Sequence, residues 1–498
     1  MKLDHIDRAC KIRRTKIIAT LGPATDKRED LHAIINAGAD VLRLNMSHGP
    51  AETHVHRARM VREVAAELGR EVAILIDLQG PKIRIEKFAD GMVQLQQGDR
   101  FTLDADDHST PGTRQRVGVS YADLPDDVQV GNVLLLDDGL ISMRVVAING
   151  RKIVCEVENG GKLSDRKGIN LQGGGLSISG IAEHDLPHIR LAAELEADYL
   201  AVSFPSCAED MQRARDLLRK AGGHAALMAK IERVEAIYNL EEICDAADAV
   251  LVARGDLGVE IGDAELPGLQ KRIILTALKL NCIVVTATQM MQSMIENPIP
   301  TRAEVLDVAN AVIDGSDAVM LSAETAIGKH PGKVVEAMNR ICLGAERHFD
   351  REGVSIQLNV RFQKIDQAIA MAAMFMAKNV SVQAIVALTE SGSTAQWLSR
   401  VQSSVPIFAL SPNVTSRRRM ALFRDVYPVA HQPQGEDMDQ CVSDISQLLW
   451  RKGHIRSGDR VIVTMGDTLG REGGTNTLRL IKVGPDGYAE KQTRLDLH

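Results

Sequence analysis

The sequence lacks a long block of basic residues. It contains 59 Lys and Arg residues against 66 Asp and Glu residues, which gives a net charge of −7. Because nucleic-acid binding requires clustered positive charge, we expect no nucleic-acid partner. Any phosphate group must therefore be bound by local positive sites. Aromatic residues are also scarce, at 3%.

Cysteine is sparse and irregularly placed. The 7 cysteines are odd in number and never spaced Cys-x-x-Cys, which argues against a disulfide framework or a zinc site. They are Cys10, Cys155, Cys207, Cys244, Cys282, Cys342 and Cys441. This usage fits a reducing, cytoplasmic location.

Long apolar runs are missing as well. No apolar run reaches about 18 residues, the length of a membrane-spanning helix. The start, Met1 to Arg14, is charged and has no signal-peptide core. We therefore expect no membrane partner.

The rest of the composition is that of a folded chain with a large core. Hydrophobic residues make up 45% of the 498 residues and charged residues 25%. These values predict two to four domains.

Eight short apolar runs alternate with helical patterns, three of them before residue 80 and five after residue 175. This rhythm predicts an α/β fold, a (β/α)8 TIM barrel with its reactive residues at the carboxyl ends of the strands. The expected strands are 16–21, 40–44, 71–76, 198–202, 225–231, 249–253, 282–286 and 317–321.

The alternation is interrupted by a segment of a different character. Residues 80–175 show short alternating runs with turn signals at Gly98-Asp99, Asp138-Gly139 and Asn149-Gly150, which predict an inserted, mostly β domain. Further strands after residue 351 predict a C-terminal α/β domain. The expected division is 1–79 and 176–350 for the barrel, 80–175 for the insert and 351–498 for the C-terminal domain.

Two strand ends carry the charged residues that could hold a metal. Lys230 and Glu232 stand at i and i+2, so they project to one side, and Gly255-Asp256 opens a turn into a helix start. Glu232 and Asp256 could together bind Mg²⁺, with Lys230 beside a phosphorylated substrate. For Lys230 and Glu232 alone, a solvated ion pair is the simpler interpretation.

The surrounding motifs favour the metal and phosphate site over the solvated ion pair. The sequence reads Lys-Ile-Glu at 230–232, Ala-Arg-Gly-Asp-Leu-Gly-Val-Glu at 253–260, Ala-Thr-Gln-Met at 287–290, Pro-Thr-Arg-Ala-Glu-Val at 300–305 and Ser-Ala-Glu-Thr at 322–325. In order and spacing these motifs resemble the pyruvate kinase family over nearly the whole chain. The resemblance implies transfer of the phosphoryl group of phosphoenolpyruvate to ADP, which gives pyruvate and ATP.

The resemblance also implies roles for these residues. Mg²⁺ or Mn²⁺ on Glu232 and Asp256 bridges enolate and phosphoryl oxygens, and Lys230 offsets charge on the moving group. Amides near Gly255 receive the substrate carboxylate. Thr288 is expected to orient a water or relay that protonates the enolate, because its own hydroxyl is a poor acid. Arg254 and Glu260 could instead be structural partners.

The motif Arg-Leu-Asn-Met-Ser-His-Gly at 43–49 also matches the family. Arg43, Asn45 and Ser47 fall at i, i+2 and i+4, so an extended chain presents all three to the barrel mouth. By resemblance Arg43 contacts the transferring phosphoryl group, whereas a rim salt bridge is the alternative for an isolated arginine. For His48, a nucleotide contact and a hydrogen-bonded structural role stay open.

The motif Asp-Leu-Gln-Gly-Pro-Lys-Ile-Arg at 77–84 departs from the commoner family pattern, which has Glu where this chain has Lys82. In members with that Glu, K⁺ is held at the positions of Asn45, Ser47, Asp77 and the Leu78 carbonyl. The Lys82 ammonium could supply the same fixed charge. We therefore expect catalysis without added K⁺, whereas a solvated hinge lysine is the alternative.

Two further sets of residues are placed by the resemblance. Arg84 and Lys167 are expected to contact phosphate groups. Lys167 would do so from the insert, which the resemblance implies is a β-barrel lid domain. This lid is expected to close about Gly80-Pro81 and 173–175 to exclude water. A hydroxyl-rich turn in the C-terminal domain matches the family's effector pocket, although most such loops merely cap helices. Its residues are Thr389, Ser391, Gly392, Ser393 and Thr394, over which Arg471 could close.

The expected effector is a phosphorylated sugar or a nucleotide monophosphate, and the expected assembly is a homotetramer, as in the family. Two other classes stay open. A metal-dependent aldolase or lyase would need neither the β insert nor Lys82 and Arg84 beside a phosphate. A non-catalytic metabolite sensor would have no need for Lys230, Glu232, Asp256 and Thr288 together.

Overall fold

The computed structural model describes residues 12–348, 362, 364–401, 403–433, 437–467 and 473–490. Cys10, Arg471 and the expected domain boundary at residue 351 lie outside these described residues. The chain forms two compact units, one of 1–44, 52–75 and 290–498, the other of 45–51 and 76–289. Within the described ranges no helix is long and apolar enough to cross a membrane.

Eight parallel strands close into a barrel in the order β1-β16-β15-β14-β13-β12-β3-β2, which confirms the predicted (β/α)8 fold. Their residues are almost all buried, as expected for parallel strands covered on both faces. The strands are β1 (Lys16–Thr20), β2 (Val41–Asn45), β3 (Ala73–Asp77), β12 (Tyr199–Val202), β13 (Ala226–Ile231), β14 (Ala249–Ala253), β15 (Ile283–Ala287) and β16 (Ala318–Leu321).

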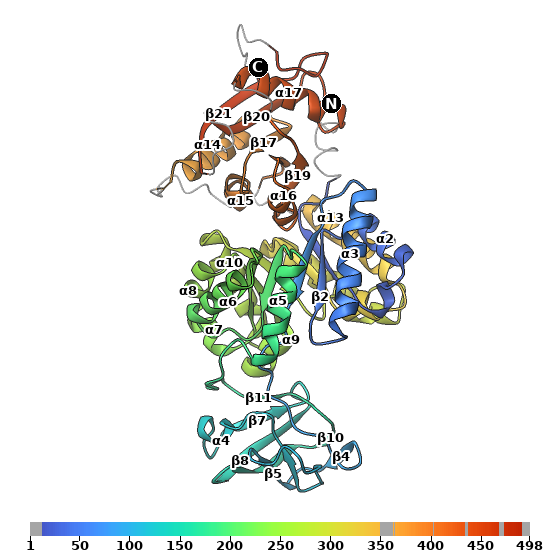
Figure 1. Cartoon of the computed structure of the whole chain (residues 1–498), viewed down its shortest axis with the longest axis vertical. Coiled ribbons are helices and arrows are strands. Elements are labelled where there is room, and N and C mark those ends of the chain that lie inside the picture. Colours follow the sequence, from blue (N-terminus) through green and yellow to red (C-terminus); the bar gives the residue numbers. More distant parts are fainter. Residues whose placement is uncertain are drawn as a thin grey trace. The chain divides into compact units, whose positions relative to one another are not determined.

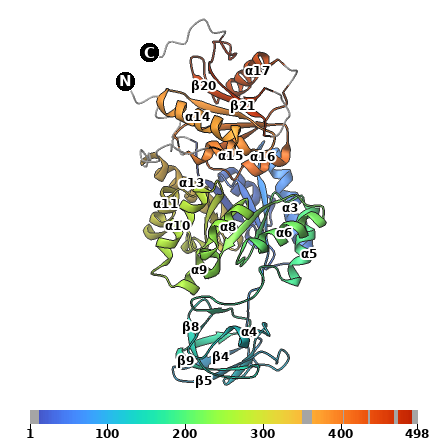
Figure 2. The same cartoon turned by 90° about the vertical axis from the view of Figure 1, so that its left-hand side faces the viewer.

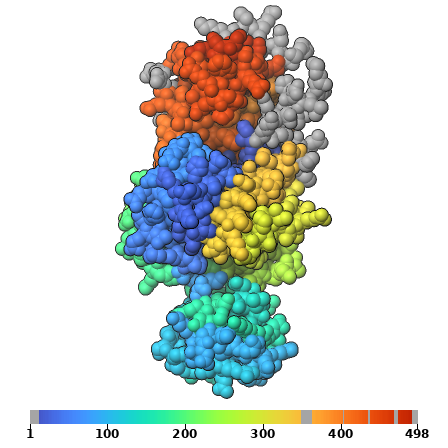
Figure 3. Space-filling view, turned by 90° about the vertical axis from the view of Figure 1, so that its right-hand side faces the viewer, coloured from blue at the N-terminus to red at the C-terminus, as the bar shows by residue number. Residues whose placement is uncertain are grey.

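Helices connect these strands. They are α2 (Arg28–Ala37), α3 (Ala51–Glu67), α5 (Leu186–Glu194), α6 (Ala208–Lys220), α7 (Val234–Tyr238), α8 (Leu240–Ala246), α9 (Arg254–Ile261), α10 (Leu266–Lys279), α11 (Arg302–Asp314), α12 (Ala323–Ala326) and α13 (Pro331–His348). Short 3-10 turns lie at η1 (Pro23–Thr25), η2 (Glu183–Asp185) and η3 (Gln292–Ile295). α13 packs against both α2 and α11, so segments from the two ends of the barrel sequence share one face (Figure 3).

The bounds of α11 follow from its sequence. Thr301 accepts a hydrogen bond from the amide of Glu304, and the Glu304 carboxylate accepts one from the amide of Thr301, which is a capping box. Val308 and Val312 are buried on the apolar side. The helix ends at Gly315, whose φ of 104° is costly for residues with a Cβ atom.

The insert is mostly β structure, as predicted. Its strands are β4 (Met92–Leu95), β5 (Arg100–Asp104), β6 (Arg116–Gly118), β7 (Val133–Leu136), β8 (Ile141–Asn149), β9 (Lys152–Asn159), β10 (Gly161–Ser164) and β11 (Ile169–Leu171), with the short helix α4 (Leu124–Asp127). They form a six-stranded sheet, β11-β7-β8-β9-β5-β6, and a two-stranded sheet, β10-β4 (Figure 2). Their buried aliphatic residues make a separate core.

The C-terminal region is an α/β sheet of order β19-β18-β17-β20-β21, parallel except for β21 (Figure 1). Its strands are β17 (Ala384–Leu388), β18 (Ile407–Ser411), β19 (Val426–Ala430), β20 (Arg460–Gly466) and β21 (Thr475–Lys482). Its helices are α14 (Ile365–Asn379), α15 (Ser393–Arg400), α16 (Val414–Met420) and α17 (Met438–Arg451). Apolar residues of α17 pack on alternate residues of β17, β18 and β20.

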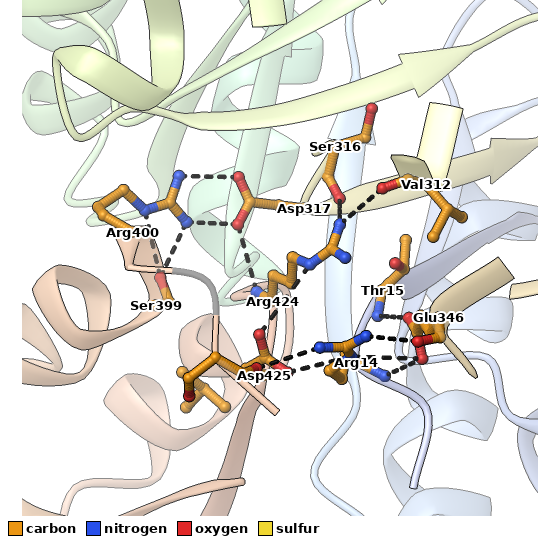
Figure 4. Close-up of polar contacts among 12 residues, drawn as sticks. Arg14, Thr15, Val312, Ser316, Asp317, Glu346, Ser399, Arg400, Arg424 and Asp425 are labelled. Atoms are coloured by element: carbon orange, nitrogen blue, oxygen red, sulfur yellow. Dashed lines mark hydrogen bonds and ion pairs between the residues drawn. The ribbon is translucent and has the colours of Figure 1, made fainter. Parts of the chain in front are cut away.

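Buried charges join this region to the barrel segments of the same unit (Figure 4). Arg400, at the end of α15, makes a two-pronged ion pair with Asp317, and both side chains are at most 6% exposed. Arg14 lies 3.9 Å from both Glu346 and Asp425. Charge pairing of this kind makes buried ions tolerable.

Asp425 gives a pH-dependent prediction for stability. Burial raises the pKa of its carboxyl group to about 6, although Arg14 and Arg424 oppose the shift. The native state therefore holds a proton that the unfolded state releases between about pH 4 and 6, so stability falls as pH rises through this window. We expect Asp425→Asn to raise the free energy of unfolding by about 1–2 kcal/mol at pH 8 and by less at pH 5.

Urea unfolding of the wild type and the variant at both pH values measures this difference. Asp90→Asn, at an exposed position, is the matched control and should change little at either pH. A loss of stability for Asp425→Asn at pH 8 would mean that its ion pairs outweigh its burial.

Candidate active site

The Lys230 ammonium lies among three acceptors at the carboxyl end of β13. It is 2.7 Å from the Ser203 hydroxyl, 3.0 Å from the Glu232 carboxylate and 3.3 Å from the Asp77 carboxylate. The side chain of Lys230 is only 13% exposed. Lys230 and Glu232 therefore share a side, as their i and i+2 spacing predicts, and their ion pair is mostly buried rather than solvated.

Glu232 is a buried carboxylate at 1% exposure. One oxygen pairs with Lys230, and the other accepts a hydrogen bond from the amide of Phe204 at 2.9 Å. Burial raises the pKa of Glu232 to about 7, Lys230 opposes the shift, and the negative charges of Asp256 and Asp77 add to it. The two expected metal ligands, Glu232 and Asp256, therefore repel each other through space.

This repulsion fits a site for a divalent cation, since a metal with oxygen preference would relieve it. Among the described residues no group of three or more His, Cys, Asp or Glu side chains could hold a metal ion. Mg²⁺ needs only one or two protein carboxylates, because water and phosphate complete its coordination. Glu232 and Asp256 match that requirement.

Lys82 already places a cation on one of these carboxylates. Its ammonium lies 2.7 Å from Asp256 and 3.9 Å from Asp138 in the inserted domain, and its side chain is 21% exposed. Lys82 is thus in an ion pair rather than fully solvated. Two of the expected vestigial K⁺ positions have partners of their own: Asp77 pairs with Lys230, and the Leu78 carbonyl accepts a hydrogen bond from Ser203.

Thr288 is held against the start of α9. Its hydroxyl donates to the Ala287 carbonyl at 2.7 Å and accepts from the amide of Gly255 at 2.9 Å. The amide expected to receive a substrate carboxylate is thus bonded to Thr288 in this structure. Thr288 has a φ of 66°, an unfavourable conformation for a β-branched residue, and the φ of Gln289 is also positive, at 52°. Arg254 fixes this turn by donating to the carbonyls of Ala287 and Thr288.

The other predicted site residues are held by their own neighbours. Arg43 is 8% exposed and donates to Thr20 at 3.0 Å, so it is not a solvated rim residue. His48 lies 3.3 Å from the Asn45 amide group, and the Asn45 oxygen accepts from the Ser47 amide at 3.2 Å.

In the inserted domain, Arg84 donates to the Arg166 carbonyl at 3.0 Å. Lys167 pairs with Asp137 at 2.7 Å. Each of these two predicted phosphate contacts is thus bound within the insert in this structure.

The hydroxyl-rich turn of the C-terminal region borders a pocket, as its residue types suggest. The pocket is lined by Leu388, Thr389, Glu390, Ser391, Ser393, Thr394, Leu410, Pro412, His431, Pro433, Gly466, Gly473 and Thr475. Gly392 has a φ of 94°, and a Cβ atom there would lie 2.9 Å from Met420, so glycine is required for two reasons. Ser393 donates to Asp366, which orients the first turn of α15.

Sequence reasoning missed Ser203 and Phe204, which contact Lys230 and Glu232. The available signal was their place directly after β12, where a barrel presents its reactive residues. Glu260 is 3% exposed and accepts hydrogen bonds from the Val234 amide and the Asn170 side chain, which fits the structural role considered for it. Burial raises the pKa of Glu260 to about 7.

Comparison with known proteins relates most of the chain to one family. Residues 12–335 match the family model for the pyruvate kinase barrel domain, and residues 367–481 match the model for the pyruvate kinase alpha/beta domain. Pyruvate kinase II of Salmonella typhimurium is 51% identical over 477 residues, which cover 95% of this chain and 99% of that protein. A pyruvate kinase of Haemophilus influenzae is 48% identical over 92% of this chain and 96% of its own length.

A solved structure agrees with the sequence relatives. The crystal structure of a pyruvate kinase from Cryptosporidium parvum superimposes with a TM-score of 0.89 at 33% identity, and the match covers 96% of this chain and 97% of that chain. The chain therefore belongs to the pyruvate kinase family of phosphotransferases.

Proposed function

We propose that the protein transfers the phosphoryl group of phosphoenolpyruvate to ADP and releases pyruvate and ATP, as the last step of glycolysis. The observation that carries this proposal is the buried cluster of Lys230, Glu232 and Asp77, with Asp256 and its Lys82 partner beside it. Such a cluster can neutralise a phosphoryl group in transit, because phosphoryl transfer depends on positioning and electrostatic stabilisation.

In this mechanism, the bond between phosphorus and the enol oxygen breaks as a bond forms to a terminal phosphate oxygen of ADP. Lys230 and Arg43 stabilise the charge on the transferring group. Glu232 and Asp256 would hold Mg²⁺ or Mn²⁺, and the bound ion would supply charge neutralisation for the substrate. The resulting enolate takes a proton at carbon from a water or relay oriented by Thr288.

The remaining predicted residues complete the substrate sites. The backbone amides at Gly255 and Asp256 bind the carboxylate end of phosphoenolpyruvate. The nucleotide is bound by Asn45, His48, Arg84 and Lys167. The segment 80–175 acts as the lid, between barrel segments 1–79 and 176–350. Closing the lid excludes water, which would otherwise compete with ADP for the phosphoryl group.

The enzyme needs no added K⁺ under this proposal. A cation beside the phosphate is required only as a fixed charge, and Lys82 provides one within 2.7 Å of Asp256. Asn45, Ser47, Asp77 and Leu78 are then vestigial monovalent-cation positions.

Regulation is assigned to the C-terminal domain, 351–498. A pocket lined by hydroxyl groups at the start of a helix suits a phosphate ester, which supports a phosphorylated sugar or a nucleotide monophosphate as effector. Its proposed contacts are Thr389, Ser391, Gly392, Ser393 and Thr394. We also carry over a cytoplasmic homotetramer from the family.

The rate of pyruvate formation from phosphoenolpyruvate and ADP tests the function. It is measured with and without Mg²⁺, with KCl or an equal ionic strength of tetramethylammonium chloride, and with candidate effectors. We expect strict dependence on the divalent metal and equal rates in both salts. Phosphate release without ATP would favour a lyase, and no reaction in any mixture would favour a sensor.

A further inference from the structure

We propose that Ser203 is a positioning residue for phosphoryl transfer, whose hydroxyl holds the Lys230 ammonium in its working orientation. The inference rests on the proposed function, which places Lys230 on the transferring group. Ser203 directly follows β12, and its side chain is completely buried.

The Ser203 hydroxyl has only one orientation that satisfies its neighbours. It accepts a hydrogen bond from Lys230 at 2.7 Å and donates one to the carbonyl of Leu78 at 2.8 Å. An ammonium group can only donate and a carbonyl can only accept, so the hydroxyl cannot reverse its role. It therefore links the ammonium to the backbone that follows β3.

Its lack of charge suits this position. Lys230 already pairs with two carboxylates, those of Asp77 and Glu232. A third carboxylate would draw the ammonium further from an incoming phosphoryl group and repel that group. A hydroxyl fixes the direction of one N–H bond without cancelling more of the positive charge.

The next residue fixes Glu232 in the same way. Phe204 has a φ of 56°, an unfavourable conformation for a bulky residue, and its amide donates to the Glu232 carboxylate at 2.9 Å. Strain of this kind persists only where surrounding contacts hold it. Ser203 and Phe204 are thus hydrogen-bonded to the expected catalytic lysine, Lys230, and to an expected metal ligand, Glu232, respectively.

A close contact with Gly80 also restricts the position of Ser203. Gly80 has a φ of 69°, and a Cβ atom there would lie 2.6 Å from the Cβ of Ser203. Leu78 and Gly80 belong to the segment that leads into the inserted domain. Ser203 therefore connects Lys230 directly to that segment.

Substitution of Ser203 separates these roles. We expect Ser203→Ala to lower kcat by about 10- to 100-fold, the value of one hydrogen bond to a charged group, with less than about a threefold change in the KM for phosphoenolpyruvate. Ser203→Cys keeps the volume but offers only a weak acceptor, so it should lose kcat similarly. Ser203→Thr keeps the hydroxyl but adds a methyl group at the Cβ that already crowds Gly80, so its kcat should fall between those of the wild type and Ser203→Ala. Ser206→Ala, on the same loop, is the matched control.

A double-mutant cycle with Lys230→Met provides the decisive readout. If Ser203 acts through Lys230, then Ser203→Ala changes kcat by less than about twofold in the Lys230→Met background. Equal losses in both backgrounds would overturn the proposal and leave Ser203 a packing residue. An active wild type with a fully active Ser203→Ala variant would also overturn it, whereas an inactive wild type would instead reject the proposed function.

Discussion

Lys230→Met lowers kcat by about a thousandfold or more and leaves the fold intact. The methionine fills a similar volume but removes the charge that is proposed to face the transferring phosphoryl group. Removing one electrostatic stabiliser of this kind lowers kcat by about 10²–10³-fold or more. The remaining carboxylates of Glu232 and Asp77 can be tolerated, because the pKa of Glu232 is already about 7 and a proton can replace the lost cation.

The pyruvate-formation assay and thermal unfolding followed by circular dichroism measure the two parts of this prediction. Lys279→Met removes an exposed lysine at the end of α10 and serves as the control, with activity near that of the wild type. A fully active Lys230→Met enzyme would refute the role of Lys230. A variant that fails to fold would show that the ammonium is needed for structure.

Lys82→Glu makes the enzyme depend on K⁺. The substitution replaces an ammonium 2.7 Å from Asp256 with a second carboxylate, and two adjacent carboxylates attract a cation from solution. We expect the rate of pyruvate formation in K⁺-free buffer to fall by about a hundredfold, because removing one electrostatic stabiliser has an effect of this size. Adding KCl should then raise the rate of the variant by at least about tenfold.

The control for Lys82→Glu is Lys87→Glu, the same charge change at an exposed position of the insert. Rates are compared in KCl and in tetramethylammonium chloride at equal ionic strength, so that screening cannot produce the difference. A Lys82→Glu enzyme as active as wild type in both salts would show that the ammonium has no part in catalysis. Loss without recovery in KCl would show that it does not substitute for K⁺.

The fold could be predicted closely from the sequence because burial dictates its pattern. A run such as 249–253 is apolar throughout, as a parallel strand covered on both faces must be, and the structure has β14 at these bounds. The turn at Asn149-Gly150 likewise joins β8 to β9, as its residues predict. The exact domain boundaries stay predictions.

The site could be predicted only where chemistry follows spacing along the chain. Lys230 and Glu232 lie two residues apart, so strand geometry brings them together. Lys82 and Asp256 are 174 positions apart, so no local sequence pattern predicts their ion pair. Phe204 and Thr288 have positive φ values, which residues of these types rarely adopt. Their backbone conformations could therefore not be predicted from the sequence.

The closed order of the barrel strands has a consequence for synthesis on the ribosome. β1 pairs with β16 through Lys16 and Ala318, so the first barrel strand to be made must wait for the last barrel strand. At about 5–20 residues per second, this delay is on the order of 15–60 s. The β insert needs only pairings within its own segment and can be complete long before then. Until the barrel closes, one side of β1 is an open edge that a chaperone could protect from aggregation.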